Sequence, residues 1–241
     1  MLERTNSTPL YIQVRDILSA RLESGEYKVN DKIPSESQLC SEFGISRVTL
    51  RSVLTELVRD GKLYRVQGKG TYVAEPKIEA NTGSYVGVRE QLESQGYDVS
   101  TIVLSVEKTA CPPAIAATMG LKDGEEVYHI KRLRKIKDVP LSIHDSYIPV
   151  AYADGLEKSD FCNEQLCRIL SDDYGLNRAS VTEMIESVSA RDDEAELLNI
   201  RKGYPLIRLR DVIADRSGKA FEWSSVVFRG DKMQIKMHFE M

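Results

Sequence analysis

Two helical segments separated by a single residue constrain this chain more than any other feature of its sequence. The segment PSESQLCSEFG has a serine cap at Ser35, apolar residues on one face and a terminating glycine at Gly44. Ser46 then has the features of an N-cap for a second segment, RVTLRSVLTELV, whose apolar residues recur at helical spacing. Because only Ile45 lies between Gly44 and Ser46, we expect a tight helix-turn-helix with the second helix in the recognition position.

The flanking segments extend this motif into a larger domain. Ahead of it, apolar residues between Leu10 and Leu22 recur at helical spacing, which predicts a first helix. After it, KLYRVQGKGTYV has the pattern of two short strands around a basic, glycine-rich tip at Gln67, Gly68 and Lys69. Three helices followed by a β-hairpin predict a winged helix-turn-helix domain over residues 1–74.

Positive charge is concentrated in this part of the chain. The whole protein has a formal net charge of -4, but residues 44–73 hold six Lys or Arg and only two Asp or Glu. Arg47 and Arg51 stand one helical turn apart, and guanidinium groups bind guanine edges or phosphates. Small hydroxyl groups near a helix N-terminus bind phosphate as well. Arginines on an ordinary solvated helix face are the alternative, but the caps, the local charge and the basic hairpin together favour DNA binding.

The stretch from PLYIQVRDIL to KLYRVQGKGTYV, residues 9–73, resembles the DNA-binding domain of GntR-family bacterial transcription regulators. The motif is long and ordered, which makes the resemblance specific. It implies that eight residues contact DNA: Ser35, Ser46, Arg47, Thr49, Arg51, Gln67, Gly68 and Lys69. Asn30 stands where such sequences usually have glycine. Asparagine tolerates a positive φ better than most residues, so we expect the turn to form.

The second half of the chain predicts a different architecture. EPKIEANTG, residues 75–83, lacks an apolar period and predicts a linker. Beyond it, strands are predicted in TIVLSVE, VYHIKRLRKI, PLSIHDSYI, SVTEMIESVSA, PLIRLRDVIA, AFEWSSVVF and MQIKMHF, and helices in PPAIAATMGL, EQLCRILSDDYG and DDEAELLNI. This order predicts an antiparallel sheet with a few helices over residues 84–241, and therefore an α+β protein of two domains.

The most informative strand is YHIKRLRKI. Side chains two apart on a strand point the same way, so Arg132 and Arg134 share a face with Tyr128, Ile130 and Ile136. Two cations on a partly buried face indicate an anion-binding site. The alternative is the solvated face of an edge strand.

Two further polar residues are candidates on neighbouring strands. Glu222 in AFEWSS is either a ligand contact or a salt-bridge partner for the two arginines. His144 in PLSIHDSYI occurs alone, which is more typical of a structural histidine than of a functional one.

The segments GEEVYHIKRLRKIKDVPLSIHDSYIP and DRSGKAFEWSSVVFRGD resemble the UTRA effector-binding domain of the HutC branch of the GntR family, which has a chorismate-lyase-like fold. The resemblance spans residues 84–238. It implies an effector pocket lined by Arg132, Arg134, His144 and Glu222, with Ser84 and Tyr85 near the entrance and Phe228 at the wall. Members that bind sugar phosphates carry Ser-x-Tyr where this chain has Gln165-Leu166-Cys167, and glutamate in place of His144; the paired arginines are retained.

Other features exclude whole classes of function. No apolar run approaches the roughly 20 residues that cross a bilayer, and MLERTNSTPLY is too polar for a signal peptide, so we expect a cytoplasmic protein. Three histidines and cysteines without CxxC spacing predict free thiols, no metal site and no cofactor. The cysteines are Cys40, Cys111, Cys162 and Cys167.

The sequence therefore predicts a dimeric, ligand-responsive bacterial transcription regulator. We expect a repressor that binds a palindromic double-stranded operator and is released by a small anionic metabolite such as a phosphorylated sugar. One alternative is a lyase-type enzyme that uses the chorismate-lyase-like domain, although only Glu222 or His144 is available as an acid or base and no catalytic constellation stands out. Another is a DNA-binding protein whose second domain only dimerises.

Overall fold

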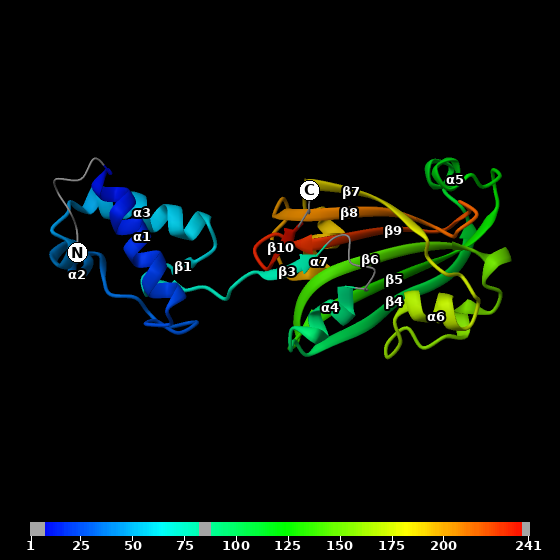
Figure 1. Cartoon of the computed structure of the whole chain (residues 1–241), viewed down its shortest axis with the longest axis horizontal. Helices are drawn as coiled ribbons and strands as arrows, with labels where there is room; N and C mark the ends of the chain where they lie inside the picture. The colour runs from blue at the N-terminus through cyan, green and yellow to red at the C-terminus, as the bar shows by residue number, and fades with distance from the viewer. Residues whose placement is uncertain (1–7, 82–87, 238–241) are drawn as a thin grey trace. The chain divides into compact units, whose positions relative to one another are not determined.

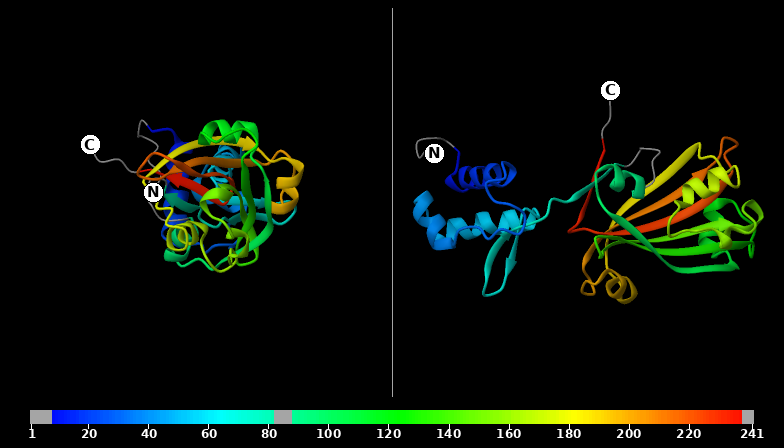
Figure 2. Two further views of the ribbon diagram at one scale, coloured as in Figure 1. Left: turned by 90° about the vertical axis from the view of Figure 1, so that its right-hand side faces the viewer. Right: turned by 90° about the horizontal axis from the view of Figure 1, so that it is seen from below.

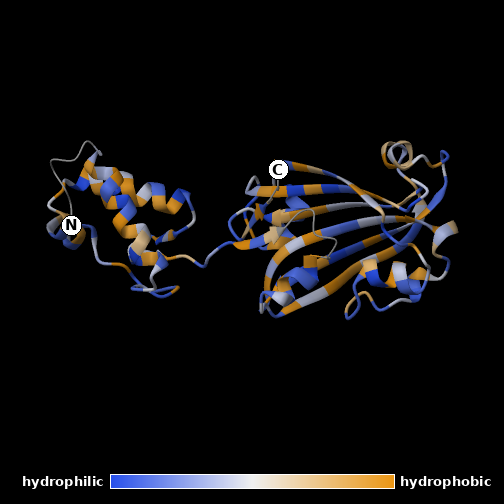
Figure 3. Cartoon of the chain, in the orientation of Figure 1, coloured by the Kyte–Doolittle hydropathy of each residue, from blue (hydrophilic) through white to orange (hydrophobic). Residues whose placement is uncertain are grey.

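The computed structural model describes residues 8–81 and 88–237, and the chain divides into two compact units (Figure 1). The first unit is Met1–Lys77 and the second is Ile78–Met241. Hydrophobic and hydrophilic residues alternate along the strands and along the longer helices (Figure 3). The buried apolar residues form separate clusters in the two units.

The first unit is the predicted winged helix-turn-helix. Its elements are α1 (Leu10–Glu23), α2 (Glu36–Phe43), α3 (Arg47–Arg59) and the antiparallel strands β1 (Leu63–Val66) and β2 (Gly70–Val73). All three helices and the hairpin contribute to one core, in which Val14, Leu39, Leu50 and Leu54 are completely or almost completely buried. This core holds the recognition helix α3 against α1 and α2.

The caps of α2 and α3 form as their sequences predict. The Ser35 hydroxyl accepts a hydrogen bond from the Gln38 backbone N–H, and the Gln38 side chain accepts one from the Ser35 N–H, which completes a capping box. The Ser46 hydroxyl accepts a hydrogen bond from the Thr49 N–H at 3.1 Å. Gly44 ends α2 in the left-handed conformation, and Asn30 also adopts a positive φ, of 68°, as expected.

The second unit is built on a six-stranded antiparallel sheet in the order β4-β5-β6-β9-β8-β7. Its strands are β4 (Val99–Ala110), β5 (Glu126–Ile136), β6 (Val139–Pro149), β7 (Ser180–Ser189), β8 (Pro205–Ala214) and β9 (Ala220–Arg229). Its helices are α4 (Val88–Ser94), α5 (Pro113–Met119), α6 (Leu166–Asp172) and α7 (Asp192–Leu198). The sheet confirms the predicted α+β class, whereas α4 was not predicted.

The two faces of the sheet are covered differently (Figure 2). On the face that carries Tyr128 and Ile130, α6 and the loops around it complete an apolar cluster. On the opposite face, α7 packs against Leu133 and Ile143. We call the first the inner face and the second the outer face.

Residues 75–83 are not a linker throughout. Ile78–Asn81 forms strand β3, which pairs in parallel with β10 (Met233–Lys236). Ile78 and Ala80 are buried and pack in one cluster with Met233. The partner strand lies at the far end of the sequence, and for this reason local patterning did not reveal β3.

Among residues 8–81 and 88–237, no helix has both the length and the apolar character needed to span a membrane.

Candidate functional site

The first turn of α3 is exposed and carries the residues expected to contact DNA. Arg47 is exposed, and Arg51 is 65% exposed with its Nε 2.8 Å from a carboxylate oxygen of Glu36. The hydroxyl groups of Ser46 and Thr49 lie 2.8 Å apart at the N-terminus of the helix. Positive charge and hydroxyl groups therefore meet at the helix end that has free backbone N–H groups.

Val48 on the same turn was not identified from the sequence. Its side chain is 77% exposed, although α3 otherwise buries its apolar residues. An exposed apolar group at this position suits contact with a thymine methyl group in the major groove. Its position off the apolar stripe of Leu50, Val53 and Leu54 was the available signal.

The wing presents the other expected contacts at its tip. Gln67, Gly68 and Lys69 are all exposed in the turn between β1 and β2. Gly68 has a φ of 72°, and the Lys69 N–H donates to the Val66 carbonyl at 3.0 Å. The turn therefore holds the Lys69 side chain at the free end of the hairpin.

In the second unit, Arg132 and Arg134 lie on an internal strand rather than at an edge. Strand β5 pairs with β4 on one side and β6 on the other, and the two residues are only 4% and 6% exposed. In register with them on β6 stand His144 and Ser142. The alternative of a solvated edge-strand face is therefore wrong, because both guanidinium groups are buried inside the unit.

Three of the six guanidinium nitrogens of these arginines are buried and unsatisfied among the described residues. Arg132 Nη2 donates to the Ser146 hydroxyl at 3.1 Å. Arg132 Nε, Arg134 Nε and Arg134 Nη1 are buried and have no hydrogen-bond partner among the described residues. An unpaired buried donor costs about 1–3 kcal/mol, and a charged one costs more. A bound anion would supply the missing acceptors.

Burial opposes the charge of both arginines, although a guanidinium group in a protein stays protonated. Burial, together with the positive charges of Arg132 and Arg89, lowers the pKa of Arg134 to about 9. Burial also lowers the pKa of Arg132, while the negative charge of Glu222 opposes this effect. The site is therefore positively charged before any ligand binds.

His144 is a neutral neighbour of the arginines. Its Nε2 lies 2.9 Å from the Ser142 hydroxyl, and its ring meets the edge of Phe228 at a centroid distance of 6.0 Å. Burial and the charges of Arg134 and Arg132 lower the pKa of His144 well below 6.5, so the ring is uncharged at neutral pH. Phe228 is completely buried.

Glu222 completes the expected set on β9. It is 6% exposed, and burial raises the pKa of its carboxyl group, while Arg132 and a hydrogen bond with Ser146 oppose the shift. It does not form an ion pair with either arginine within the described part of the chain. Ser84 and Tyr85, which were expected near the entrance, lie outside the described residues.

Four further residues lie close to the arginines, His144 or Glu222: Ser142, Ser146, Cys167 and Arg178. Cys167 is half-buried, and burial and the charge of Glu222 raise the pKa of its thiol, while Arg178 and Arg134 oppose the rise. Period two from His144 identifies both serines as residues of the same face. The sequence contains no comparable signal for Arg178, which precedes β7.

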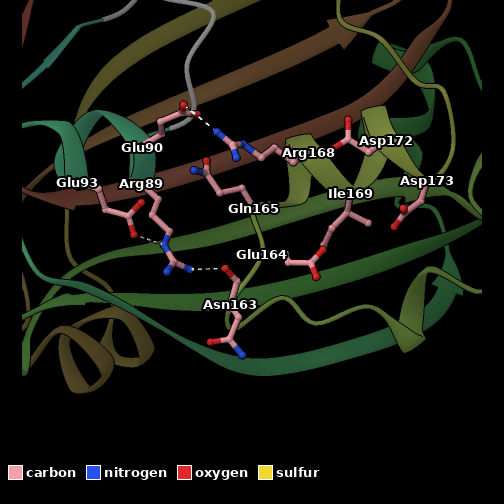
Figure 4. A pocket seen from close by; sticks show the side chains of 10 residues that line it. All are labelled: Arg89, Glu90, Glu93, Asn163, Glu164, Gln165, Arg168, Ile169, Asp172 and Asp173. Atoms are coloured by element: carbon pink, nitrogen blue, oxygen red, sulfur yellow. Dashed lines mark hydrogen bonds and ion pairs between the residues drawn. The ribbon is translucent and has the colours of Figure 1, made fainter.

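A cavity of about 380 Å³ lies between α4 and the segment 163–173 (Figure 4). Arg89 on α4 donates to Glu93 at 2.7 Å and to the Asn163 carbonyl at 3.3 Å. Arg168 on α6 pairs with Glu90 on α4 at 2.9 Å. These contacts hold α4 to α6, and Arg89 also lies near enough to affect the charge of Arg134.

Within residues 8–81 and 88–237, no group of three or more His, Cys, Asp or Glu side chains is arranged to hold a metal ion. All four cysteines are free thiols.

Comparison with known proteins identifies a family for each of the two parts of the chain. Residues 10–73 match the family model of bacterial regulatory proteins of the gntR family, and residues 94–234 match that of the UTRA domain. The chain is 30% identical over 232 residues to the HTH-type transcriptional repressor NagR of Bacillus subtilis (strain 168), covering 96% of this chain and 95% of the relative. It is also 30% identical over 202 residues to the histidine utilization repressor of Pseudomonas aeruginosa, covering 84% of this chain and 80% of the relative. The crystal structure of PhnF from Mycobacterium smegmatis has a TM-score of 0.68 and 25% identity, and covers 94% of this chain and 99% of that chain.

Proposed function

This chain belongs to the GntR family of bacterial regulatory proteins and carries a UTRA domain, and we propose that it represses genes as a homodimer that a small anionic effector releases from DNA. Its family and its named relatives are transcription regulators, so the chain is a ligand-responsive DNA-binding regulator. An enzyme of the lyase type is not favoured for the same reason. Because its operator lies in chromosomal DNA, we place its action in the cytoplasm.

In this proposal the first turn of α3 enters the major groove and the wing follows the phosphate backbone. Arg47 and Arg51 contact base edges or phosphates, and Ser46 and Thr49 contact phosphate next to the helix N-terminus. The other proposed DNA contacts are Ser35, Gln67, Gly68 and Lys69. Their exposure supports these assignments.

The effector is proposed to bind on the inner face of the sheet. The observation that carries this proposal is a set of three buried guanidinium nitrogens, on Arg132 and Arg134, that have no hydrogen-bond partner in the described part of the chain. His144, Glu222 and Phe228 would complete the pocket wall. Ser84 and Tyr85 stay candidates from the resemblance alone.

A homodimer suits a palindromic operator, because a two-fold axis in the protein then matches that of the DNA. Strand β7 offers a surface for it. This ten-residue strand lies at the edge of the sheet, and its Val181, Met184 and Ile185 are exposed. A long, apolar edge strand tends to pair with another chain, and we propose a second copy of this chain as the partner.

The proposed function is tested by operator release. Selection from a random duplex library with the full-length protein would yield its preferred sequence, and fluorescence anisotropy would measure its affinity. We expect a palindromic site, and we expect a small oxyanion to reduce the affinity of the wild-type protein but not of Arg132→Ala/Arg134→Ala. Selection of an asymmetric site would contradict the homodimer. Equal release of wild type and double variant would contradict the proposed effector site.

A further inference from the structure

The inner face carries charge of opposite sign at its two sides. Cross-strand neighbours share a face, and the register connects Ile130, Ser146, Ser224 and Asp211 in one row across β5, β6, β9 and β8. Arg132 and Arg134 follow Ile130 at period two on β5, and Glu222 precedes Ser224 at period two on β9. The arginines and the acids Glu222 and Asp211 therefore face the same space.

The acidic side of the inner face brings together several carboxyl groups and one arginine. Asp211 Oδ2 accepts a hydrogen bond from the Ser224 hydroxyl at 3.2 Å, and the Asp211 carboxyl group lies close enough to that of Glu183 to share a hydrogen bond with it. Glu183 stands opposite Asp211 on β7 and adds a further carboxyl group. Arg178 lies near enough to Asp211 and Glu222 to favour their charged forms. Asp211 and Glu222 therefore face the same space as the paired arginines and can accept hydrogen bonds from a cationic group.

We propose that the effector is dipolar, with an oxyanion that binds Arg132 and Arg134 and a protonated amine that binds Asp211 and Glu222. The inference rests on the proposed effector site and specifies the class of ligand. An oxyanion alone satisfies the donors of the arginines but offers no donor to the carboxyl groups of Asp211 and Glu222. An ammonium group provides three donors and a charge of the required sign. Neighbouring strands are about 4.8 Å apart, so the backbones of β5 and β8 are about 14 Å apart, a span over which the two ends of one small metabolite can reach side chains of both strands.

Matched pairs of ligands test the amine directly. The probes are O-phosphoethanolamine against ethyl phosphate and γ-aminobutyrate against butyrate, titrated calorimetrically into the full-length wild-type protein. In at least one pair we expect the amine-bearing member to bind about tenfold more tightly, the order expected for one charge-assisted hydrogen bond. The pair that shows the effect also tells phosphate from carboxylate. Equal affinities within both pairs, or no binding by any of the four probes, would overturn the proposal.

Variants assign the preference to its residues. Asp211→Asn and Glu222→Gln should abolish the difference in affinity between the amine-bearing probe and its partner. Asp145→Asn is the matched control, because Asp145 pairs with His129 on the outer face of the same sheet at 2.9 Å. Loss of the preference in Asp145→Asn as well would show a general structural effect and would count against the proposal. The wild-type comparison needs no variant, so a destabilised variant does not prevent a decision.

Operator release, measured in parallel, separates this inference from the proposed function. An amine-bearing probe that binds preferentially but does not release DNA would contradict the proposed function alone. Release by both members of a pair at the same concentrations would contradict only the dipolar effector.

Discussion

At the scale of single residues, the two buried arginines have a cost for stability. Both are more than nine-tenths buried, and three of their nitrogens have no hydrogen-bond partner among the described residues. Replacing a buried charge by an apolar side chain of similar volume is often neutral or stabilising. We therefore propose that these two arginines serve ligand binding rather than the stability of the free protein.

Arg134→Met should separate stability from response. Because the variant removes two unpaired buried nitrogens, we expect the free energy of unfolding without ligand to rise by about 1–3 kcal/mol. Operator affinity without effector should stay nearly unchanged, since Arg134 and the winged domain belong to different units. Release by the effector should be lost. Thermal melts and anisotropy titrations measure these effects, and Lys135→Met on the outer face is the control. If the effector releases Arg134→Met from DNA as readily as wild type, Arg134 does not bind the effector.

Arg47→Ala should lower sequence specificity. A lost bidentate base contact costs about 1–3 kcal/mol for the operator and much less for unrelated DNA. Arg59→Ala is the control, because Arg59 stands at the other end of α3, is 74% exposed and pairs with Asp60. Anisotropy with operator and unrelated duplexes measures the ratio of the two affinities. An unchanged ratio in Arg47→Ala would mean that this arginine does not contact bases.

At the scale of the element, the edge strand β7 carries an acid in an unfavourable setting. Although Glu183 is exposed on this edge strand, partial desolvation, the negative charge of Asp211 on β8 and a hydrogen bond with Asp211 raise the pKa of Glu183 from 4.5 to about 7. An acid whose pKa is raised on folding favours the folded state only while it is protonated. Its contribution to stability is therefore greatest below pH 4.5 and is lost as the pH rises to about 7.

Glu183→Gln should accordingly change the pH dependence of stability. We expect the variant to melt at a higher temperature than wild type above pH 7, and the difference to shrink as the pH falls towards 4.5. Thermal melts of the full-length protein across this range measure the difference. Glu186→Gln, which loses an ion pair with Arg210 of 2.7 Å on the outer face, should not show the gain. A difference that does not vary with pH would contradict this account.

At the scale of the whole molecule, the sheet has two edges, β4 and β7, and each exposes apolar residues. Ile102 on β4 is 40% exposed, whereas Met184 and Ile185 on β7 are 55% and 39% exposed. Binding to both halves of a palindrome requires that one of these edges, or another surface, joins two copies. For the proposed homodimer we therefore expect operator affinity to depend on assembly as well as on the DNA contacts.

Met184→Lys should weaken the dimer, because a charge on an edge strand opposes pairing with a second strand. Sedimentation at micromolar concentration should detect monomer, and operator affinity should fall while binding to a single half-site is kept. Ile102→Lys on β4 is the matched control and should leave the dimer intact. If only Ile102→Lys dissociates the dimer, the interface lies at β4 and the assignment to β7 is wrong.

Features that depend on residues close together in the chain could be predicted from the sequence. The caps at Ser35 and Ser46 and the turn at Gly44 involve neighbours within four positions, so the helix-turn-helix was predictable. The shared face of Arg132 and Arg134 follows from the alternation of side chains along one strand.

Which strands are internal, and which side chains face the arginines, depends on contacts between segments far apart in the chain. Strand β3 forms by pairing with β10, which lies more than 150 residues away in the sequence, so its neighbours in the chain do not reveal it. Asp211 and Glu222 meet the space above Arg132 because β6, β9 and β8 pair in a particular order and register. The stability of such pairings comes from burial summed over many side chains of the whole sheet, and no short segment contains that information. The unpaired guanidinium nitrogens, on which the proposed effector site rests, are visible only in the packed structure.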